Sequence, residues 1–176
     1  MSSRSQRRVL SVPARCLSIR FVSGVVLGMA VVLPLSATSA RAQSDDQAVI
    51  AVVNKFFEGM RTRDTALLRS TSVPSTVLQT AGGTAGVSEP MRIDQFIQRV
   101  GKGTGPGGTE VIKDPKVQSD GEMASLWAYF TYTRGGETQI NHCGIDEFLL
   151  RKGPDGWKVF YVADTHRTQG CAPIAK

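Results

Sequence analysis

The chain has 176 residues, and its formal net charge of +6 lies entirely within the first 42. That segment holds six of the 21 Lys and Arg residues and no Asp or Glu, which leaves residues 43–176 with 15 basic and 15 acidic side chains. Nucleic-acid binding requires a lasting surplus of cations, and the neutral remainder does not supply one. The 134 residues that remain suffice for one compact core and are too few for two ordinary domains.

Residues 1–42 have the order of a secretory signal peptide. Arginines punctuate residues 1–20, an uncharged apolar stretch follows, and Ala40-Arg41-Ala42 places small residues where a signal peptidase cuts. We therefore expect a mature domain of residues 43–176, located in the periplasm or secreted, with no membrane attachment after cleavage. A membrane anchor is the alternative, because about 20 apolar residues can span a bilayer.

The cysteines are interpreted in the light of this export. Removal of the leader would leave Cys143 and Cys171, and an even pair in an oxidising compartment favours a disulfide. Such a bond would contribute about 3 to 4 kcal/mol in the chain-entropy model. The alternatives are two free buried thiols, or metal ligation by His142 and Cys143. Adjacent strand residues point to opposite faces and the spacing of zinc ligands is missing, so we expect no metal and no cofactor.

Three helices are expected in the first part of the domain. Apolar residues at three- and four-residue steps predict a helix over residues 46–60, with Ser44 and Gln47 spaced as a capping box. Asp64 is the expected N-cap of a short second helix. Residues 93–100 predict a third, amphipathic helix.

Glycine-rich segments are expected to connect these elements. Gly101 should stop the third helix, residues 80–88 read as a loop, and residues 101–108 as a mobile connection.

Strand patterns begin at residue 110. They predict a strand bent near Pro115, two long strands joined by a hairpin turn at Arg134-Gly135-Gly136, and a last strand; the ranges are residues 110–119, 122–133, 137–151 and 157–165. Neither face of the long strands is cleanly polar, so both faces should be covered. We expect an α+β domain with three helices on one face of the sheet and a second copy, in a homodimer, on the other.

The order of elements resembles the nuclear-transport-factor-2-like superfamily, the cystatin-like cone that includes SnoaL-type cyclases and ketosteroid isomerase. The residues that carry the resemblance are Trp127 and Tyr129, His142-Cys143-Gly144 with Asp146 and Phe148, Gly156-Trp157-Lys158, Ala163-Asp164-Thr165 and Gly170-Cys171. They look like the bacterial branch labelled "lumazine-binding", over residues 45–172. The resemblance implies a cone-shaped curved antiparallel sheet with three N-terminal helices on its concave face. It says little about activity, because this superfamily hosts enzymes, binders and assembly modules.

Ketosteroid isomerase chemistry is disfavoured by the same resemblance. Phe56 or Phe57 stands where those enzymes have a tyrosine, so no hydroxyl is present to stabilise an oxyanion. Residues 70–79, where their aspartate base would lie, contain no carboxylate.

Candidate site residues lie on the strands. His142 and Asp146 share a strand face, so the histidine is a candidate general base, a ligand contact, or half of a structural pair. Asp164 either faces the cone or only bonds backbone amides where its strand ends. The aromatic residues of the long strands are candidates for a pocket that binds a flat ligand, or else for core or dimer contact; Trp127 and Tyr129 are the better pocket candidates, with Phe56 from the first helix.

We expect an exported, dimeric domain that binds a small apolar or aromatic molecule without transforming it. The alternatives are a SnoaL- or dehydratase-like enzyme that uses His142 with Asp146 or Asp164 for proton transfer, and an envelope interaction module.

Overall fold

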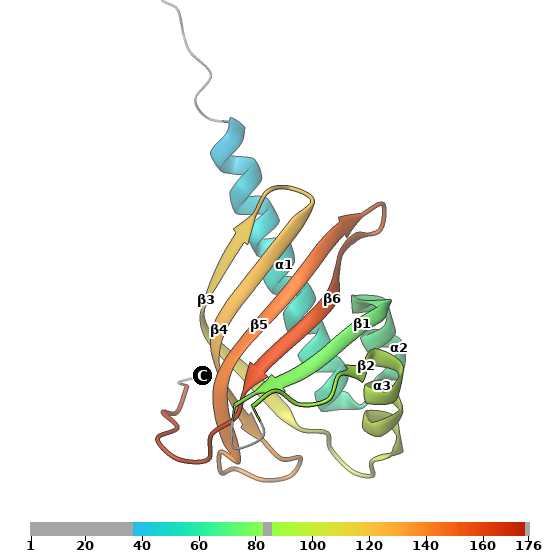
Figure 1. The fold of residues 1–176 in the computed structure, drawn as a ribbon, viewed down its shortest axis with the longest axis vertical. Coiled ribbons are helices and arrows are strands. Elements are labelled where there is room, and N and C mark those ends of the chain that lie inside the picture. The colour runs from blue at the N-terminus through green and yellow to red at the C-terminus, as the bar shows by residue number, and fades with distance from the viewer. Residues whose placement is uncertain (1–36, 83–85, 175–176) are drawn as a thin grey trace, which may run out of the picture. The chain divides into compact units, whose positions relative to one another are not determined.

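The computed structural model describes residues 37–82 and 86–174 and shows a six-stranded sheet with three helices (Figure 1). The helices are α1 (Ala37–Thr62), α2 (Thr65–Thr71) and α3 (Ile93–Lys102). The strands are β1 (Ser72–Ala81), β2 (Met91–Arg92), β3 (Thr109–Ser119), β4 (Met123–Thr133), β5 (His142–Gly153) and β6 (Gly156–Thr165).

The strand order is β2-β1-β6-β5-β4-β3, and the curved sheet carries the helices on one face (Figure 1). This confirms the expected α+β cone. It differs from the expectation in one respect: β1 and β2 precede α3, and β1 pairs with β6 in parallel, so the sheet is not wholly antiparallel. The sequence analysis missed β1 because Pro74 and the polar residues around it obscure strand alternation.

The N-terminal predictions fall partly outside the described residues. Residues 1–36 of the predicted signal peptide lie outside them, and the predicted cleavage before Gln43 falls within α1. α1 is already helical at Ala37, so Ser44 is an interior residue and the predicted capping box is wrong. None of the described helices has the length and apolar character needed to cross a bilayer.

The ends of the other helices are fixed by side chains and by backbone hydrogen bonds. Asp64 caps α2 as predicted, its Oδ1 accepting from the Leu67 backbone N–H at 2.8 Å. α3 continues through Gly101, which does not stop it, and Gly103 is the C-cap.

The segment after α3 that was expected to be mobile is instead held by Arg63. Its guanidinium donates to the carbonyl oxygens of Val100 at 2.7 Å, Gly105 at 2.9 Å and Pro106 at 3.3 Å.

The strands and their connections agree with the prediction in part. β3 bends where expected, because its pairing with β4 shifts register between Lys113 and Lys116. The predicted turn at Arg134-Gly135-Gly136 is present, since the Glu137 N–H donates to the Arg134 carbonyl oxygen at 3.0 Å. The next strand starts later than predicted, because the connection continues to residue 141 and β5 begins at His142.

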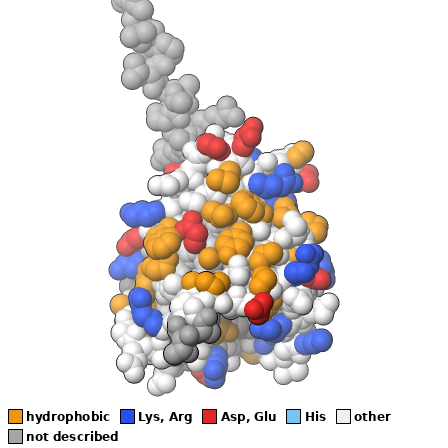
Figure 2. Space-filling model, viewed as in Figure 1, with side chains coloured by type: hydrophobic (Ala, Val, Ile, Leu, Met, Phe, Trp, Pro, Cys, Tyr) orange, Lys and Arg blue, Asp and Glu red, His pale blue; other side chains and the backbone are white. Residues whose placement is uncertain are grey.

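The two faces of the sheet differ strongly. On the inner face, side chains of β4 are buried against the helices; Ala124, Leu126, Ala128 and Phe130 are at most 1% exposed. On the outer face, Met123 and Trp127 are 51% and 52% exposed, and hydrophobic side chains gather across the view in Figure 2. The predicted homodimer that would cover this face stays a prediction.

Candidate functional site

A group of ionisable side chains lies at one end of the inner face, and we call it the mouth cluster: Glu110, His142, Asp146, Asp164 and His166. It includes the three residues that the sequence analysis proposed for proton transfer. The β5–β6 register sets Asp146 directly opposite Asp164, and the rings of His142 and His166 lie 4.2 Å apart. Glu110 shares a hydrogen bond between carboxyl groups with Asp146.

A bulge in β6 turns Asp164 toward the cone. The pairing with β5 shifts between Leu149, which pairs with Tyr161, and Leu150, which pairs with Val159. The extra residue is Phe160, and it reverses the alternation after that point. Val159 and Val162 are therefore both buried, although strict alternation would place them on opposite faces.

Gly144 makes room for the chain that leaves β6. A Cβ atom at Gly144 would lie 1.6 Å from the Thr165 carbonyl oxygen, which only a glycine tolerates. The backbones of Cys143 and Arg167 exchange two hydrogen bonds, each of 2.9 Å. This close approach brings His166 beside His142 on the inner face.

The buried carboxyl groups of the cluster hold protons more tightly than usual. Burial raises the pKa of Glu110 to about 7, and the charge of Asp164 adds to this rise while the hydrogen bond with Asp146 opposes it. Burial also raises the pKa of Asp146, and Glu110 raises it further. Because neither group ionises easily beside the other, the pair retains a proton near neutral pH.

The two histidines have opposite electrostatic environments. His166 Nε2 lies 2.8 Å from Asp164 Oδ2, and this hydrogen bond raises the pKa of His166. Burial, followed by the charge of His166, lowers the pKa of His142. His142 Nδ1 lies 3.0 Å from Asn141 Oδ1; an N–H donated there leaves Nε2 with its lone pair. His142 does not bond Asp146, and its ring instead stacks on Tyr132 at 4.6 Å.

Two buried oxygen atoms of the cluster lack a donor. Among the described residues, Asp146 Oδ2 and Asp164 Oδ1 have no hydrogen-bond partner. A buried acceptor without a donor costs about 1 to 3 kcal/mol. Native chains keep such groups where they serve a ligand or a reaction more often than in an ordinary core.

A pocket of about 440 Å³ opens beside the cluster, and we call it the mouth pocket. Asp164 and His166 form its polar wall. Gln79, Glu89 and Arg99 also line it, and its apolar lining comes from β1, β2, α3 and β6: Leu78, Met91, Phe96 and Val162.

The other predicted ligand contacts lie apart from this pocket. Phe56 is 2% exposed and packs edge-on against Phe148, with ring centres 5.8 Å apart, so it belongs to the closed core. Trp127 and Tyr129 lie on the outer face. Of the four predicted ligand residues, only His142 reaches the mouth cluster.

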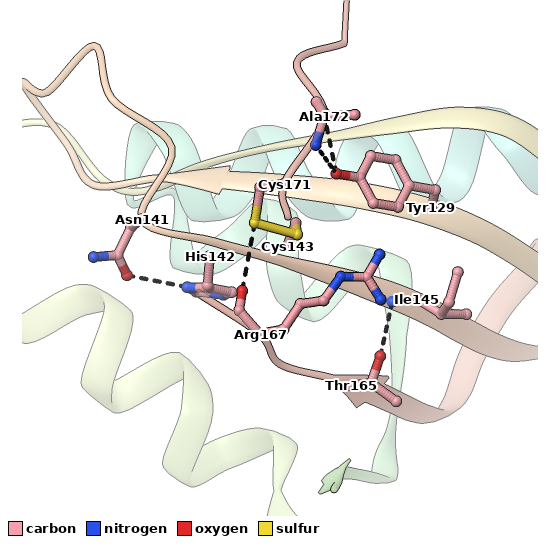
Figure 3. The surroundings of a disulfide bond; sticks show 9 residues. All are labelled: Tyr129, Asn141, His142, Cys143, Ile145, Thr165, Arg167, Cys171 and Ala172. Atoms are coloured by element: carbon pink, nitrogen blue, oxygen red, sulfur yellow. Dashed lines mark hydrogen bonds between the residues drawn. A yellow bond between two sulfur atoms is a disulfide. The ribbon is translucent and has the colours of Figure 1, made fainter. Parts of the chain in front are cut away.

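The predicted pair of cysteines is at bonding distance. Cys143 and Cys171 are joined, with Cα atoms 5.6 Å apart, and the bridge fastens the C-terminal tail to β5 (Figure 3). The tail is also held at Tyr129, whose hydroxyl donates to the Ala172 carbonyl oxygen at 3.1 Å and accepts from the Ala172 N–H at 2.9 Å.

Glu110 and His166 are the cluster residues that sequence reasoning missed. Glu110 lies two positions before Ile112, so strand parity alone would have placed it on the inner face. His166 follows the end of β6, and no alternation pattern reaches it.

Metal ligation is not indicated by the geometry of the described residues. No group of three or more His, Cys, Asp or Glu among them is arranged to hold a metal ion.

No protein-family model and no curated protein matches the chain. Solved structures do match. A protein of unknown function from Mycobacterium tuberculosis is 12% identical, with a TM-score of 0.63 over 74% of this chain and 76% of that one. A nuclear-transport-factor-2-like protein with a cystatin-like fold from Novosphingobium aromaticivorans is 15% identical, with a TM-score of 0.58 over 77% and 90%.

A third match is provisionally described as a dehydratase of the nuclear-transport-factor-2-like family, from Streptomyces avermitilis. It is 15% identical, with a TM-score of 0.53 over 71% of this chain and 97% of that one. The chain thus has the nuclear-transport-factor-2-like, cystatin-like cone fold. Identities this low establish the fold alone, and the lumazine-binding branch stays a prediction.

Proposed function

We propose that this chain binds a small, largely apolar molecule in the mouth pocket, and that the ligand donates a hydrogen bond to Asp164. The observation that carries the proposal is Asp164 Oδ1, a buried acceptor without a donor on a residue that lines the pocket. A ligand donor would remove the desolvation cost of this atom.

The pocket suits a ligand of modest size. Its volume of about 440 Å³ falls within the usual range for small-molecule sites. Leu78, Phe96 and Val162 offer apolar contact, while the polar wall would fix the orientation of the ligand. Because His166 already occupies Asp164 Oδ2, the ligand donor is directed to Oδ1.

The core beneath the pocket is filled by packed aromatic rings. Phe56 packs in parallel on Phe96 with ring centres 5.8 Å apart, and Phe57 packs edge-on against Phe148 at 5.5 Å. We therefore place the ligand at the mouth and not in the centre of the cone.

A thermal-shift screen with a library of aromatic heterocycles tests the binding proposal. We expect some members to raise the melting temperature of the wild-type chain. Asp164→Asn should abolish the response, because the amide replaces an acceptor with a donor at one of two positions. Asp155→Asn, in the exposed β5–β6 turn, is the matched control and should respond like the wild type. A library without any effect, or equal responses of both variants, would contradict the proposal.

Proton-transfer chemistry of the dehydratase type is a second candidate. It is favoured by one arrangement: the Glu110–Asp146 pair, whose pKa values burial raises, lies on the same face as His142, whose pKa burial lowers and whose Nδ1 lies beside Asn141 Oδ1. An acid and a base set apart in this way are what elimination of water requires.

Turnover of a library hit, followed by proton NMR, tests this candidate. His142→Gln should abolish turnover while the melting temperature changes little. Binding without any turnover in the wild type would leave the binding proposal standing and remove the enzymatic one.

We also propose that the mature chain is exported and begins at Gln43. The cysteine pair at bonding distance supports this, since such bonds persist in oxidising compartments. The contact between α1 and β5 would survive cleavage. In it, Lys152 Nζ donates to Asp45 Oδ1 at 2.5 Å, and Asp45 lies after the predicted cut. Mass spectrometry of the protein recovered from its producing cells should find Gln43 as the first residue, and an intact N-terminus would contradict export by cleavage.

A further inference from the structure

A second hollow lies on the opposite face of the sheet, and we call it the outer groove. Its volume is about 530 Å³. Its lining comes from the bulge of β3, the middle of β4, β5 and the C-terminal tail, chiefly Lys113, Lys116, Trp127, Tyr129, Ile145 and Arg167. None of the residues described as lining the outer groove also lines the mouth pocket.

Strand register fixes the floor of the groove and one wall. Lys113 pairs with Tyr129 and Lys116 pairs with Trp127, so each lysine lies beside an aromatic ring of the outer face. The register shift between the two lysines widens β3 at this point. Trp127 is 52% exposed and presents its indole to solvent.

The tail forms the other wall and is fastened at three points. The disulfide to Cys143, the two hydrogen bonds between Tyr129 and Ala172, and the Arg167 guanidinium 5.7 Å from the Tyr129 ring centre hold it in place. The groove is therefore formed before any ligand arrives, which lowers the entropy cost of binding.

The charges around the groove are one-sided. None of its three cationic side chains (Lys113, Lys116 and Arg167) forms an ion pair with a carboxylate among the described residues, and Asp114 is the only acidic residue in the described lining. Glu147 lies opposite Trp127 on the β5 side. An anionic group would thus be drawn toward β3 and the tail and away from β5.

We propose that the outer groove binds a flat aromatic anion, with its ring against Trp127 and its anionic group between Lys113, Lys116 and Arg167. Stacking on an exposed indole uses the ring faces of ligand and protein, and the cations select a charged ligand over a neutral one. This site is separate from the one proposed at the mouth, and either can fail without the other.

The probe for this site is 2-naphthoate, compared with neutral 2-naphthamide, titrated into ¹⁵N-labelled full-length or mature chain. The chain has two tryptophans, so two indole N–H signals report binding. Trp127→Phe assigns them. Trp157, which is 4% exposed and lies in the core, is the internal control. We expect 2-naphthoate to shift the Trp127 signal and leave the Trp157 signal in place, with about tenfold weaker binding of the amide.

Charge variants decide where the anion lies. Lys113→Gln combined with Lys116→Gln should weaken 2-naphthoate binding about tenfold, whereas Lys55→Gln combined with Lys102→Gln removes the same charge from the helices and should have little effect. Asp164→Asn should leave this binding unchanged. Added salt should weaken it, because exposed charges are screened.

Three results would overturn the proposal. Equal affinities for acid and amide would remove the role of the cations. Loss of 2-naphthoate binding in Asp164→Asn would show that the probe binds in the mouth pocket and not in the outer groove. A Trp127 signal that responds to protein concentration and not to the probe would assign the groove to a second copy of the chain.

Discussion

The inner face of β5 changes character between Asp146 and Phe148. Phe148 and Leu150 are buried in a core of aromatic and aliphatic side chains, whereas Asp146, equally buried, lies among carboxyl groups and carries an oxygen without a donor. Both ends obey the same strand alternation. Burial alone therefore does not separate core from site, whereas both buried carboxylate oxygens that lack a donor among the described residues belong to the mouth cluster.

Truncation of a side chain at the packed end of β5 should give the largest loss of stability. Phe148→Ala removes a ring that contacts both Phe56 and Phe57, and should lower the free energy of unfolding by about 3 to 5 kcal/mol. Urea denaturation measures this change. A loss below about 1 kcal/mol would show that the core end is no better packed than the mouth.

Substitution of Gly144 should give the next largest loss of stability. Gly144→Ala forces the Thr165 backbone away and should cost about 3 kcal/mol or more, with displacement of His166 from His142. Gly153→Ala, on the same strand, is the control, since its Cβ would meet only the Arg151 side chain at 3.4 Å. Equal urea midpoints of the two variants would contradict the role given to Gly144.

The pH dependence of stability should distinguish the mouth from the core. The pKa of Glu110 rises from 4.5 to about 7 on folding, so the folded chain binds more protons than the unfolded one between these values. The stabilisation from this proton is therefore full below about pH 4.5 and is lost as the pH rises through about 7, a change of about 3 kcal/mol.

The raised pKa of His166 acts in the same direction as Glu110, and the lowered pKa of His142 acts in the opposite direction. Urea denaturation at several pH values should show a smaller decline for Glu110→Gln than for the wild type. Glu137→Gln, in the exposed connection before β5, should keep the decline. Parallel profiles for all three proteins would contradict a proton held by the pair.

The smallest effect on stability is expected from Asp164→Asn, below about 1 kcal/mol. The carboxylate already lacks one partner, so the variant forfeits mainly its bond to His166. Its melting temperature without ligand measures this. A loss as large as that of Phe148→Ala would make Asp164 a structural residue.

Much of the fold was predictable because it rests on periodic patterns. The α1 stripe, the Asp64 cap and the parity of β5 all follow from local rules, and the structure confirms them. β1 was missed because its parallel partner, β6, lies far along the chain and supplies contacts that no local pattern shows.

The site was only partly predictable for a related reason. His142 and Asp146 follow from alternation on one strand, but the inward turn of Asp164 depends on the bulge at Phe160. His166 reaches the cluster because Gly144 lets another segment approach. Trp127 and Tyr129 were expected to line a pocket with Phe56 but lie on the outer face, because alternation along a strand does not tell which face of the sheet the helices cover.

A crystal structure of the chain with the strongest hit of the library screen tests the central claim most directly. We predict that the ligand lies in the mouth pocket, with a donor atom within hydrogen-bond distance of Asp164 Oδ1. A ligand bound only elsewhere, with the mouth pocket filled by protein side chains, would contradict the assignment.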